Sequence, residues 1–257
     1  MKTVSYFLLL ASLIFIGCNR NSANDISVEQ VSLERNFGNC QAKDGGCLQV
    51  NMEYPVIRQG NDSLKMAVNH AVQKFIISTL VMGEVDGENN IVKIDTALIE
   101  LEEEFRDFLD DLDFAPADWF IESIVGITYM DSSYFALNMS NSSYTGGAHP
   151  NAFVSKLIFD KNSGKTIGIE DLISNKSKLT KLVEKKLRMQ LKIPISSSLN
   201  EQGFWFENDV FHLPANVGLS NDGLEFFYNY YEIAPYAMGV TDIIISMDEL
   251  KRKGLLK

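Results

Sequence analysis

Hydrophobic and polar residues recur with two different periods along this chain, and these periods predict its elements. A period of two predicts strands over residues 31–37 and 48–57, and a helical period predicts two helices that open at the Asp62-Ser63 and Asp95-Thr96 pairs. From residue 119 the period of two returns and predicts an antiparallel meander. Strands are predicted over 121–130, 134–144, 152–160, 210–213, 224–231 and 241–245. A helical region is predicted over 170–192, and a short last helix begins at 247.

Strands and helices come in blocks rather than in strict alternation, which predicts an α+β protein with antiparallel sheets and packed helices. The chain has 257 residues, of which 46% are hydrophobic and 22% charged, so it is long enough to bury a sizeable core. We divide it into an N-terminal α+β domain over 28–147 and a C-terminal α+β domain over 148–257. The two parts are expected to be sub-domains of one body.

The first eighteen residues predict export. Lys2 precedes an apolar run, residues 6–16, that is too short to span a bilayer. The run ends in Phe15-Ile16-Gly17-Cys18, which resembles the bacterial lipobox. We therefore expect a lipoprotein signal peptide over 1–17, a lipid on Cys18 that anchors the protein to the membrane, and a polar tether over 18–27. An uncleaved apolar anchor is the alternative.

The residues after Cys18 bear on which side of the envelope the protein faces. Asn19-Arg20-Asn21 lacks the acidic run that resembles the surface-export tags of Bacteroidota lipoproteins. We therefore expect a lipid anchor, in the outer membrane, that faces the periplasm, with the cell surface as the alternative.

Cys40 and Cys47 are the two remaining cysteines, and an exported chain favours a disulfide between them. The stretch between them is polar and contains Gly45-Gly46, which suits a tight reversal between two strands. A metal or redox site is the alternative, but it lacks the C-x-x-C spacing and a nearby histidine. A ring this small stabilises the fold by at most roughly 2.5 kcal/mol.

Charge and motifs exclude several functions. The net charge is -11, with 34 acidic against 23 basic residues, which opposes binding to nucleic acid and suits a cationic protein partner. The helix after residue 95 has an acidic face, residues 100–113, but lacks the calcium-loop pattern, so a solvated face is favoured over a metal site. The motifs G-x-S-x-G, H-E-x-x-H and G-x-G-x-x-G are absent, and no cofactor or metal is expected.

Both Asp-Ser/Thr pairs predict helix N-caps, because their side-chain oxygens can accept from unpaired backbone N–H groups. Asp62-Ser63-Leu64 and Asp95-Thr96-Ala97 also resemble the O-glycosylation signal of exported Bacteroidota proteins. Modification at Ser63 or Thr96 is compatible with capping.

Two segments contain the candidate ligand-binding residues. The first is the loop Tyr144-Thr145-Gly146-Gly147-Ala148-His149-Pro150-Asn151, whose glycines permit close backbone approach, either to a ligand or as a purely structural turn. The second, residues 226–239, holds six aromatic side chains, of which alternation buries about half. The candidate ligand-binding residues are Tyr144, Gly146, Gly147, His149, Asn151, Tyr228, Asn229, Glu232 and Tyr236.

His149 also supports an alternative function, an envelope glycan or peptide hydrolase or deacetylase. In that alternative His149 is the general base, and Asp131 or Glu232 orients it. The other two histidines suggest structural positions, His70 on a helix surface and His212 within a strand.

These segments resemble a known pair of domains. The stretches YTGGAHPN, DKNSGK, IGIEDLI and LSNDGLEFFYNYYEIAPYAMG are similar to the extracytoplasmic domain shared by RsiV-like anti-sigma factors and PdaC-like peptidoglycan deacetylases. Residues 28–145 resemble the smaller domain that precedes it. RsiV-like proteins recognise lysozyme with this region, but this chain shows no sigma-binding segment and no separate deacetylase domain. The resemblance implies a stand-alone envelope lipoprotein, and we expect a non-enzymatic module that binds peptidoglycan glycan or a cationic protein such as lysozyme.

Overall fold

The computed structural model describes residues 26–41, 46–81, 93–111 and 117–257. The expected signal peptide, Cys18 and the tether up to residue 25 lie outside the described residues. Residue 27, the last of the expected tether, already belongs to the first strand. No helix in the described ranges has the length and apolar character needed to cross a bilayer.

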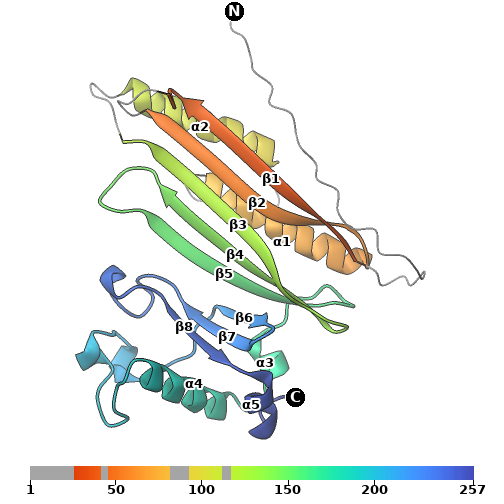
Figure 1. The fold of residues 1–257 in the computed structure, drawn as a ribbon, viewed down its shortest axis with the longest axis vertical. Helices are drawn as coiled ribbons and strands as arrows, with labels where there is room; N and C mark the ends of the chain where they lie inside the picture. Colours follow the sequence, from red (N-terminus) through yellow and green to blue (C-terminus); the bar gives the residue numbers. More distant parts are fainter. Residues whose placement is uncertain (1–25, 42–45, 82–92, 112–116) are drawn as a thin grey trace, which may run out of the picture.

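The first part of the molecule is a five-stranded sheet with the spatial order β1-β2-β3-β4-β5 (Figure 1). Its strands are β1 (Ser27–Gly38), β2 (Cys47–Gln59), β3 (Trp119–Met130), β4 (Tyr134–Tyr144) and β5 (Asn151–Asp160). The predicted antiparallel meander is confirmed in β3, β4 and β5. The pattern did not predict that β2 and β3 are parallel, as the long crossover through two helices permits.

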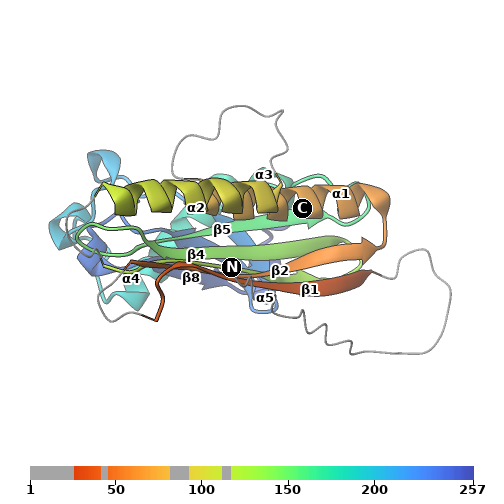
Figure 2. The ribbon, with the colours of Figure 1, turned by 90° about the horizontal axis from the view of Figure 1, so that it is seen from above.

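The crossover helices, α1 (Asp62–Leu80) and α2 (Ile94–Asp110), both lie on one face of this sheet (Figure 2). Their apolar stripes pack on side chains that alternate along the strands, which is why the helical and strand periods together build one core. The core includes Leu64, Val68, Val72, Phe75, Leu101, Phe105, Leu48, Val50, Ile121, Val125 and Leu137.

Both helix starts differ from the predicted caps. Asn61 is the N-cap of α1, because its side chain accepts a hydrogen bond from Leu64 N at 3.1 Å. Asp62 lies in the first turn and pairs instead with Lys65. At α2 the N-cap position is Lys93, which makes no side-chain capping bond, so Asp95 also lies inside the first turn. The helix dipole stabilises a negative charge at this position. Glycosylation of Ser63 or Thr96 stays a prediction.

A disulfide joins Cys40 to Cys47, as predicted, with a Cα–Cα distance of 4.6 Å. It lies at the end where β1 meets β2, beside the hydrogen bond from Asn39 N to Gly46 O. The bond therefore fixes this end of the pair.

The second part of the molecule is built around an antiparallel sheet of β6 (Val217–Ser220), β7 (Gly223–Tyr228) and β8 (Thr241–Ile245). The helices are α3 (Ile169–Leu172), α4 (Lys176–Gln190) and α5 (Met247–Arg252), with short 3-10 turns η1 (Asn200–Gln202), η2 (Glu207–Asp209) and η3 (Tyr236–Met238). The prediction of a strand over 210–213 is wrong. This segment is irregular, although its Phe211 is buried, and the strand β6, which was not predicted, follows it in the chain.

The predicted domain division between residues 147 and 148 falls between β4 and β5, two strands that pair along their whole length from Ser143↔Asn151 to Tyr134↔Asp160. The loop around residue 148 is therefore a hairpin connection, and the two sheets separate only after Asp160. Strand β5 also contributes Ile158 to the core of the second part, so the two sub-domains share β5.

The outward edge of β5 is closed by side-chain amides of the second part. Val154 N donates to Asn229 Oδ1 at 2.7 Å, and Lys156 N donates to Asn216 Oδ1 at 2.7 Å. Both amide groups also donate to Val154 O, at 2.8 Å from Asn216 and 2.9 Å from Asn229. Backbone groups that an edge strand would leave unpaired are thus satisfied without a sixth strand.

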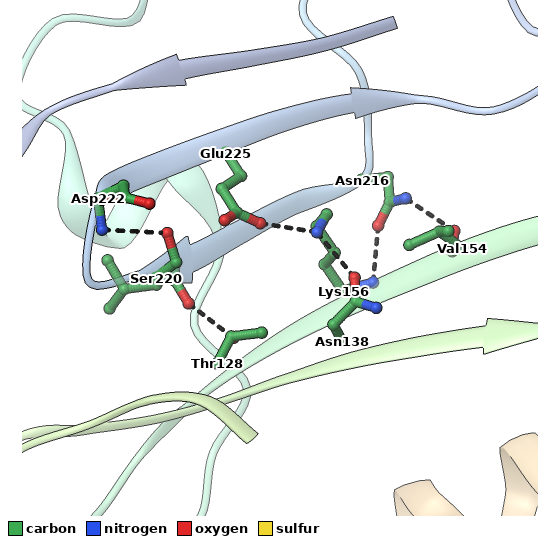
Figure 3. Close-up of polar contacts among 9 residues, drawn as sticks. Thr128, Asn138, Val154, Lys156, Asn216, Ser220, Asp222 and Glu225 are labelled. Carbon is green, nitrogen blue, oxygen red and sulfur yellow. Dashed lines mark hydrogen bonds and ion pairs between the residues drawn. The ribbon is translucent and has the colours of Figure 1, made fainter. Parts of the chain in front are cut away.

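Lys156 adds a buried ion pair to this junction (Figure 3). Its ammonium lies 2.7 Å from Glu225 and 2.8 Å from Asn138 Oδ1, and only 8% of the Lys156 side chain and 13% of the Glu225 side chain are exposed. Nearby, Thr128 Oγ1 donates to Leu219 O, which ties β3 to β6. We name the set Asn138, Lys156, Asn216, Glu225 and Asn229 the amide–lysine junction.

Candidate functional site

The loop between β4 and β5 presents the predicted His149 on the surface. Gly146 and Gly147 both have φ near 100°, which other residues rarely adopt. A Cβ on either would meet no other atom within 4 Å, so the backbone conformation, rather than crowding, requires glycine here. Tyr144 closes the loop by donating its hydroxyl hydrogen to Gly147 O at 3.0 Å.

His149 stacks on Tyr236, with ring centroids 4.2 Å apart and planes inclined by 20°. Its Nδ1 lies 2.9 Å from Pro150 O, and its Nε2 lies 3.1 Å from the hydroxyl of Tyr231. A carbonyl oxygen only accepts, so Nδ1 carries the proton in the neutral ring and Nε2 accepts from Tyr231. Contacts on both ring nitrogens and one ring face therefore fix the orientation of the imidazole.

Three tyrosines from the connection between β7 and β8 complete the arrangement. Tyr230 stacks on Tyr236, the ring that also stacks on His149, with 4.5 Å between the ring centroids of the two tyrosines. The ring centroid of Tyr231 lies 5.7 Å from that of Tyr236. Tyr236 also places its hydroxyl 3.4 Å from Pro150 O. We name His149, Tyr230, Tyr231 and Tyr236 the aromatic cluster.

Tyr231 is held in a strained backbone conformation. Its φ is 62°, in the left-handed region that an aromatic residue seldom occupies, and 54% of the residue is exposed. The conformation costs about 1–2 kcal/mol relative to the right-handed regions. Strain of this kind concentrates at functional sites, and here it places an exposed ring beside His149.

The structure gives three predicted binding residues other roles. Tyr228 is fully buried, so it is not on the binding surface; its hydroxyl donates to His212 O, and burial raises the pKa of Tyr228 far above its ordinary value. Asn229 binds the edge of β5, and Glu232 accepts a hydrogen bond from Asn229 N at 2.9 Å. Asn151 is exposed at the start of β5.

The carboxylates proposed to orient His149 are engaged elsewhere. Asp131 precedes β4 whereas His149 follows it, so the 11 residues of this strand separate them by about 35 Å. Burial alone would raise the pKa of Asp131, but hydrogen bonds from the backbone of Tyr134 and Ser133 and from the Tyr129 hydroxyl bring it below its usual value. In the described residues, His149 contacts a hydroxyl and a carbonyl but no carboxylate.

The sequence did not identify Tyr230 and Tyr231 as members of the aromatic cluster, or Trp205 as a residue near it. Tyr230 and Tyr231 lie within the predicted aromatic stretch, but strict alternation could not show that the strand ends at Tyr228, that Tyr230 stacks on Tyr236 and that Tyr231 is exposed. Trp205, 48% exposed, donates its backbone N–H to Ile233 O at 3.0 Å and so lies beside the same connection. Its isolated position in the sequence carried no signal.

A separate groove of about 1210 Å³ lies between β5, α4 and the irregular segment 209–217. It is lined by side chains of both charges, among them Lys176, Lys181, Glu184 and Asp209, together with His212. His149 is not part of it. Across the described ranges, no three His, Cys, Asp or Glu side chains are grouped so that they could hold a metal ion.

Two family models match this chain in succession. The model described as Deacetylase PdaC matches residues 41–152, and the model described as a protein of unknown function, DUF3298, matches residues 170–248. This chain is thus similar to a PdaC domain over its first matched segment and to a DUF3298 domain over its second. The aromatic cluster draws on both matched segments, since His149 belongs to the first and the three tyrosines to the second.

Solved structures of DUF3298 proteins share the fold. A family member from Bacteroides fragilis NCTC 9343 is 20% identical, with a TM-score of 0.65 over 92% of this chain and 96% of that one. A family protein from Pseudomonas aeruginosa PAO1 is 18% identical, with a TM-score of 0.63 over 92% and 97%. No curated protein matches the chain. At these identities the likeness concerns the fold alone.

Proposed function

We propose that this protein is a lipid-anchored, periplasm-facing binding module of the cell envelope, and that the aromatic cluster binds peptidoglycan glycan. The observation that carries the proposal is the stacked series Tyr230–Tyr236–His149, with an exposed and strained Tyr231 beside it. The apolar faces of sugar rings stack on aromatic side chains, while hydroxyl tips supply hydrogen bonds. Tyr230 and Tyr236 are half-buried and His149 and Tyr231 are exposed, and none of the four belongs to the hydrophobic core of either sub-domain.

The arrangement favours binding over hydrolysis. A general base needs a group that orients it and stabilises its charged form, and the partner of Nε2 is a phenol that donates to it. His149 is also held at Nδ1 and on one ring face, which suits a rigid platform. We therefore assign His149 to ligand contact.

A cationic protein such as lysozyme is the second candidate ligand. The net charge of -11 favours it, because opposite charge accelerates encounter. Binding to such a partner should weaken steeply as salt is raised, whereas stacking on a neutral glycan should depend little on salt.

Co-sedimentation with purified peptidoglycan, and separately capture on immobilised lysozyme, test the proposal. We expect His149→Ala combined with Tyr236→Ala to lower retention on peptidoglycan at least about tenfold, equivalent to about 1.4 kcal/mol. His70→Ala is the matched control, because His70 is exposed on α1. Retention equal to wild type in the double variant would overturn the assignment. Salt-sensitive capture by lysozyme alone would replace the glycan with the protein ligand.

A further inference from the structure

The two sheets have four edges, and β1 differs from the other three. The edge of β5 is closed by Asn216 and Asn229, and the edge strands of the smaller sheet, β6 and β8, are only 4 and 5 residues long. By contrast, β1 has 12 residues, contains no proline or lysine, and keeps a regular register from Val28 to Gly38. Short length, prolines and charges are the usual protection of an edge; β1 is long and has no proline, and its charges, Glu29, Glu34 and Arg35, are of both signs.

The register shows which backbone groups of β1 face away from β2, on the side where no described strand pairs with it. Asn39 N donates to Gly46 O, and this pair continues the register Gly38↔Cys47. Hydrogen-bonded and non-bonded pairs alternate in an antiparallel ladder, so the odd-numbered residues of β1 bond to β2. The even-numbered residues therefore turn their N–H and C=O groups outward: Val28, Gln30, Ser32, Glu34 and Asn36. In agreement, Glu34 O accepts from the exposed side chain of Arg35 at 2.9 Å.

We propose that β1 pairs antiparallel with β1 of a second copy of this chain, about a twofold axis at Ser32, and so joins two five-stranded sheets into one. An axis at Ser32 places outward-facing residues opposite outward-facing residues, as an antiparallel ladder requires. The pairing is isologous, so it closes as a dimer.

The side chains of β1 are self-complementary in this register. Glu29 faces Arg35 of the second copy, Gln30 faces Glu34, and Val31 faces Leu33, and each pair occurs twice. Shifting the axis by one residue in either direction removes the opposite-charge pairs. Within its own chain Glu29 pairs with Arg58, but both side chains are at least half exposed, so this contact yields readily.

The overall charge opposes this association and makes salt a useful variable. Each copy carries -11, and screening at an ionic strength of about 0.15 M shortens the range of the repulsion to about 8 Å. The dimer rests on backbone hydrogen bonds, so it strengthens as salt is raised, the reverse of an association driven by opposite charges.

Sedimentation equilibrium of the chain from Asn19 onward tests the proposal, since in the described part of the molecule both cores lie after residue 25. We expect a monomer–dimer equilibrium at physiological salt. Ser32→Pro removes an outward N–H at the axis and is expected to weaken the dimer at least about tenfold, while circular dichroism and thermal unfolding show a folded chain. A monomer at every concentration, or a dimer unaffected by Ser32→Pro, would overturn the proposal.

Two cysteine variants test the register. In Ser32→Cys the two thiols face each other across the axis, within disulfide reach, so mild oxidation should give a covalent dimer. In Glu34→Cys, on the same strand and the same face, the thiols lie about 14 Å apart and should not cross-link. Equal cross-linking of both variants, or cross-linking of Glu34→Cys alone, would contradict the axis at Ser32.

Discussion

Two neighbouring regions are made by the same two segments, the hairpin β4–β5 and the chain around β7, and they use their polar groups in opposite ways. In the amide–lysine junction, Asn216 and Asn229 complete the edge of β5, and Lys156 is bonded to both Glu225 and Asn138. In the aromatic cluster, His149 and Tyr231 are exposed, and Tyr231 adopts a strained backbone. The junction holds the fold together, whereas the cluster depends on the fold for its position.

This difference separates stability from function within a short stretch of sequence. Asn229 and Tyr231 are two positions apart, yet one closes a sheet and the other presents a ring. Substitutions in the junction should therefore change the free energy of unfolding, and substitutions in the cluster should change binding.

The largest expected effect is that of Lys156→Met. It leaves the Glu225 carboxylate buried without its cation, and the free energy of unfolding should fall by about 3 kcal/mol. Urea denaturation measures it. The control is Lys176→Met, because Lys176 and Glu170 form an exposed pair whose loss should cost less than about 0.5 kcal/mol. Equal costs for both variants would show that the junction is not buried.

Asn229→Ala should lower the free energy of unfolding by about 2 kcal/mol, because it leaves Val154 N without its acceptor at the edge of β5. Asn151→Ala, at an exposed position on the same strand, is the control and should stay within about 0.5 kcal/mol of wild type. If the two variants unfold at the same urea concentration, the amide does not close the edge.

Asp242→Asn should instead stabilise the protein at neutral pH. Asp242 Oδ1 is buried and has no hydrogen-bond partner among the described residues, and burial, then Glu225, raises the pKa of this carboxyl, while Lys156 opposes the rise. A folded-state pKa above the unfolded one means that ionised Asp242 weakens the fold above that pKa and has no such effect below the unfolded value. We therefore expect Asp242→Asn to raise the free energy of unfolding at pH 7. The gain should vanish on acidification through about pH 4; a gain that is independent of pH would contradict this cause.

The smallest change in stability is expected for Tyr231→Asn. Asparagine tolerates the left-handed region, so Tyr231→Asn should stay within about 0.5 kcal/mol of wild type, whereas the β-branched Tyr231→Val should be less stable by about 1 kcal/mol. Both variants lose the ring and should lose retention on peptidoglycan. Thermal unfolding beside co-sedimentation separates the two effects. Full retention in Tyr231→Asn would remove this ring from the site.

The sequence predicted the parts of the fold that periodicity controls. The meander β3–β5, the strand β8 and the helix α5 follow from local alternation and spacing, and the disulfide from cysteine count and compartment. The parallel pair β2–β3 and the closing of β5 by amides are long-range events that no local pattern contains. The N-cap Asn61 was missed by one residue, since Asn61 and Asp62 are both good caps and only geometry separates them.

The candidate site was predicted only in part, because local patterns identify its loops but not which of their side chains are buried. His149 and Tyr236 were identified from their loops and lie in contact. Tyr228 was misplaced, because alternation did not show which side chains of this strand are buried, and in the structure Phe226, Phe227 and Tyr228 all are.

The three histidines of the chain lie on three different surfaces, which permits one direct test of glycan binding by the aromatic cluster. His149 belongs to the aromatic cluster, His70 is exposed on α1, and His212 lines the separate groove. Histidine ring resonances are followed by NMR while soluble peptidoglycan glycan fragments are added. We expect saturable shifts of His149, with His70 and His212 unchanged. Shifts of His212 without His149, or no shift of any histidine at saturating fragment, would contradict it.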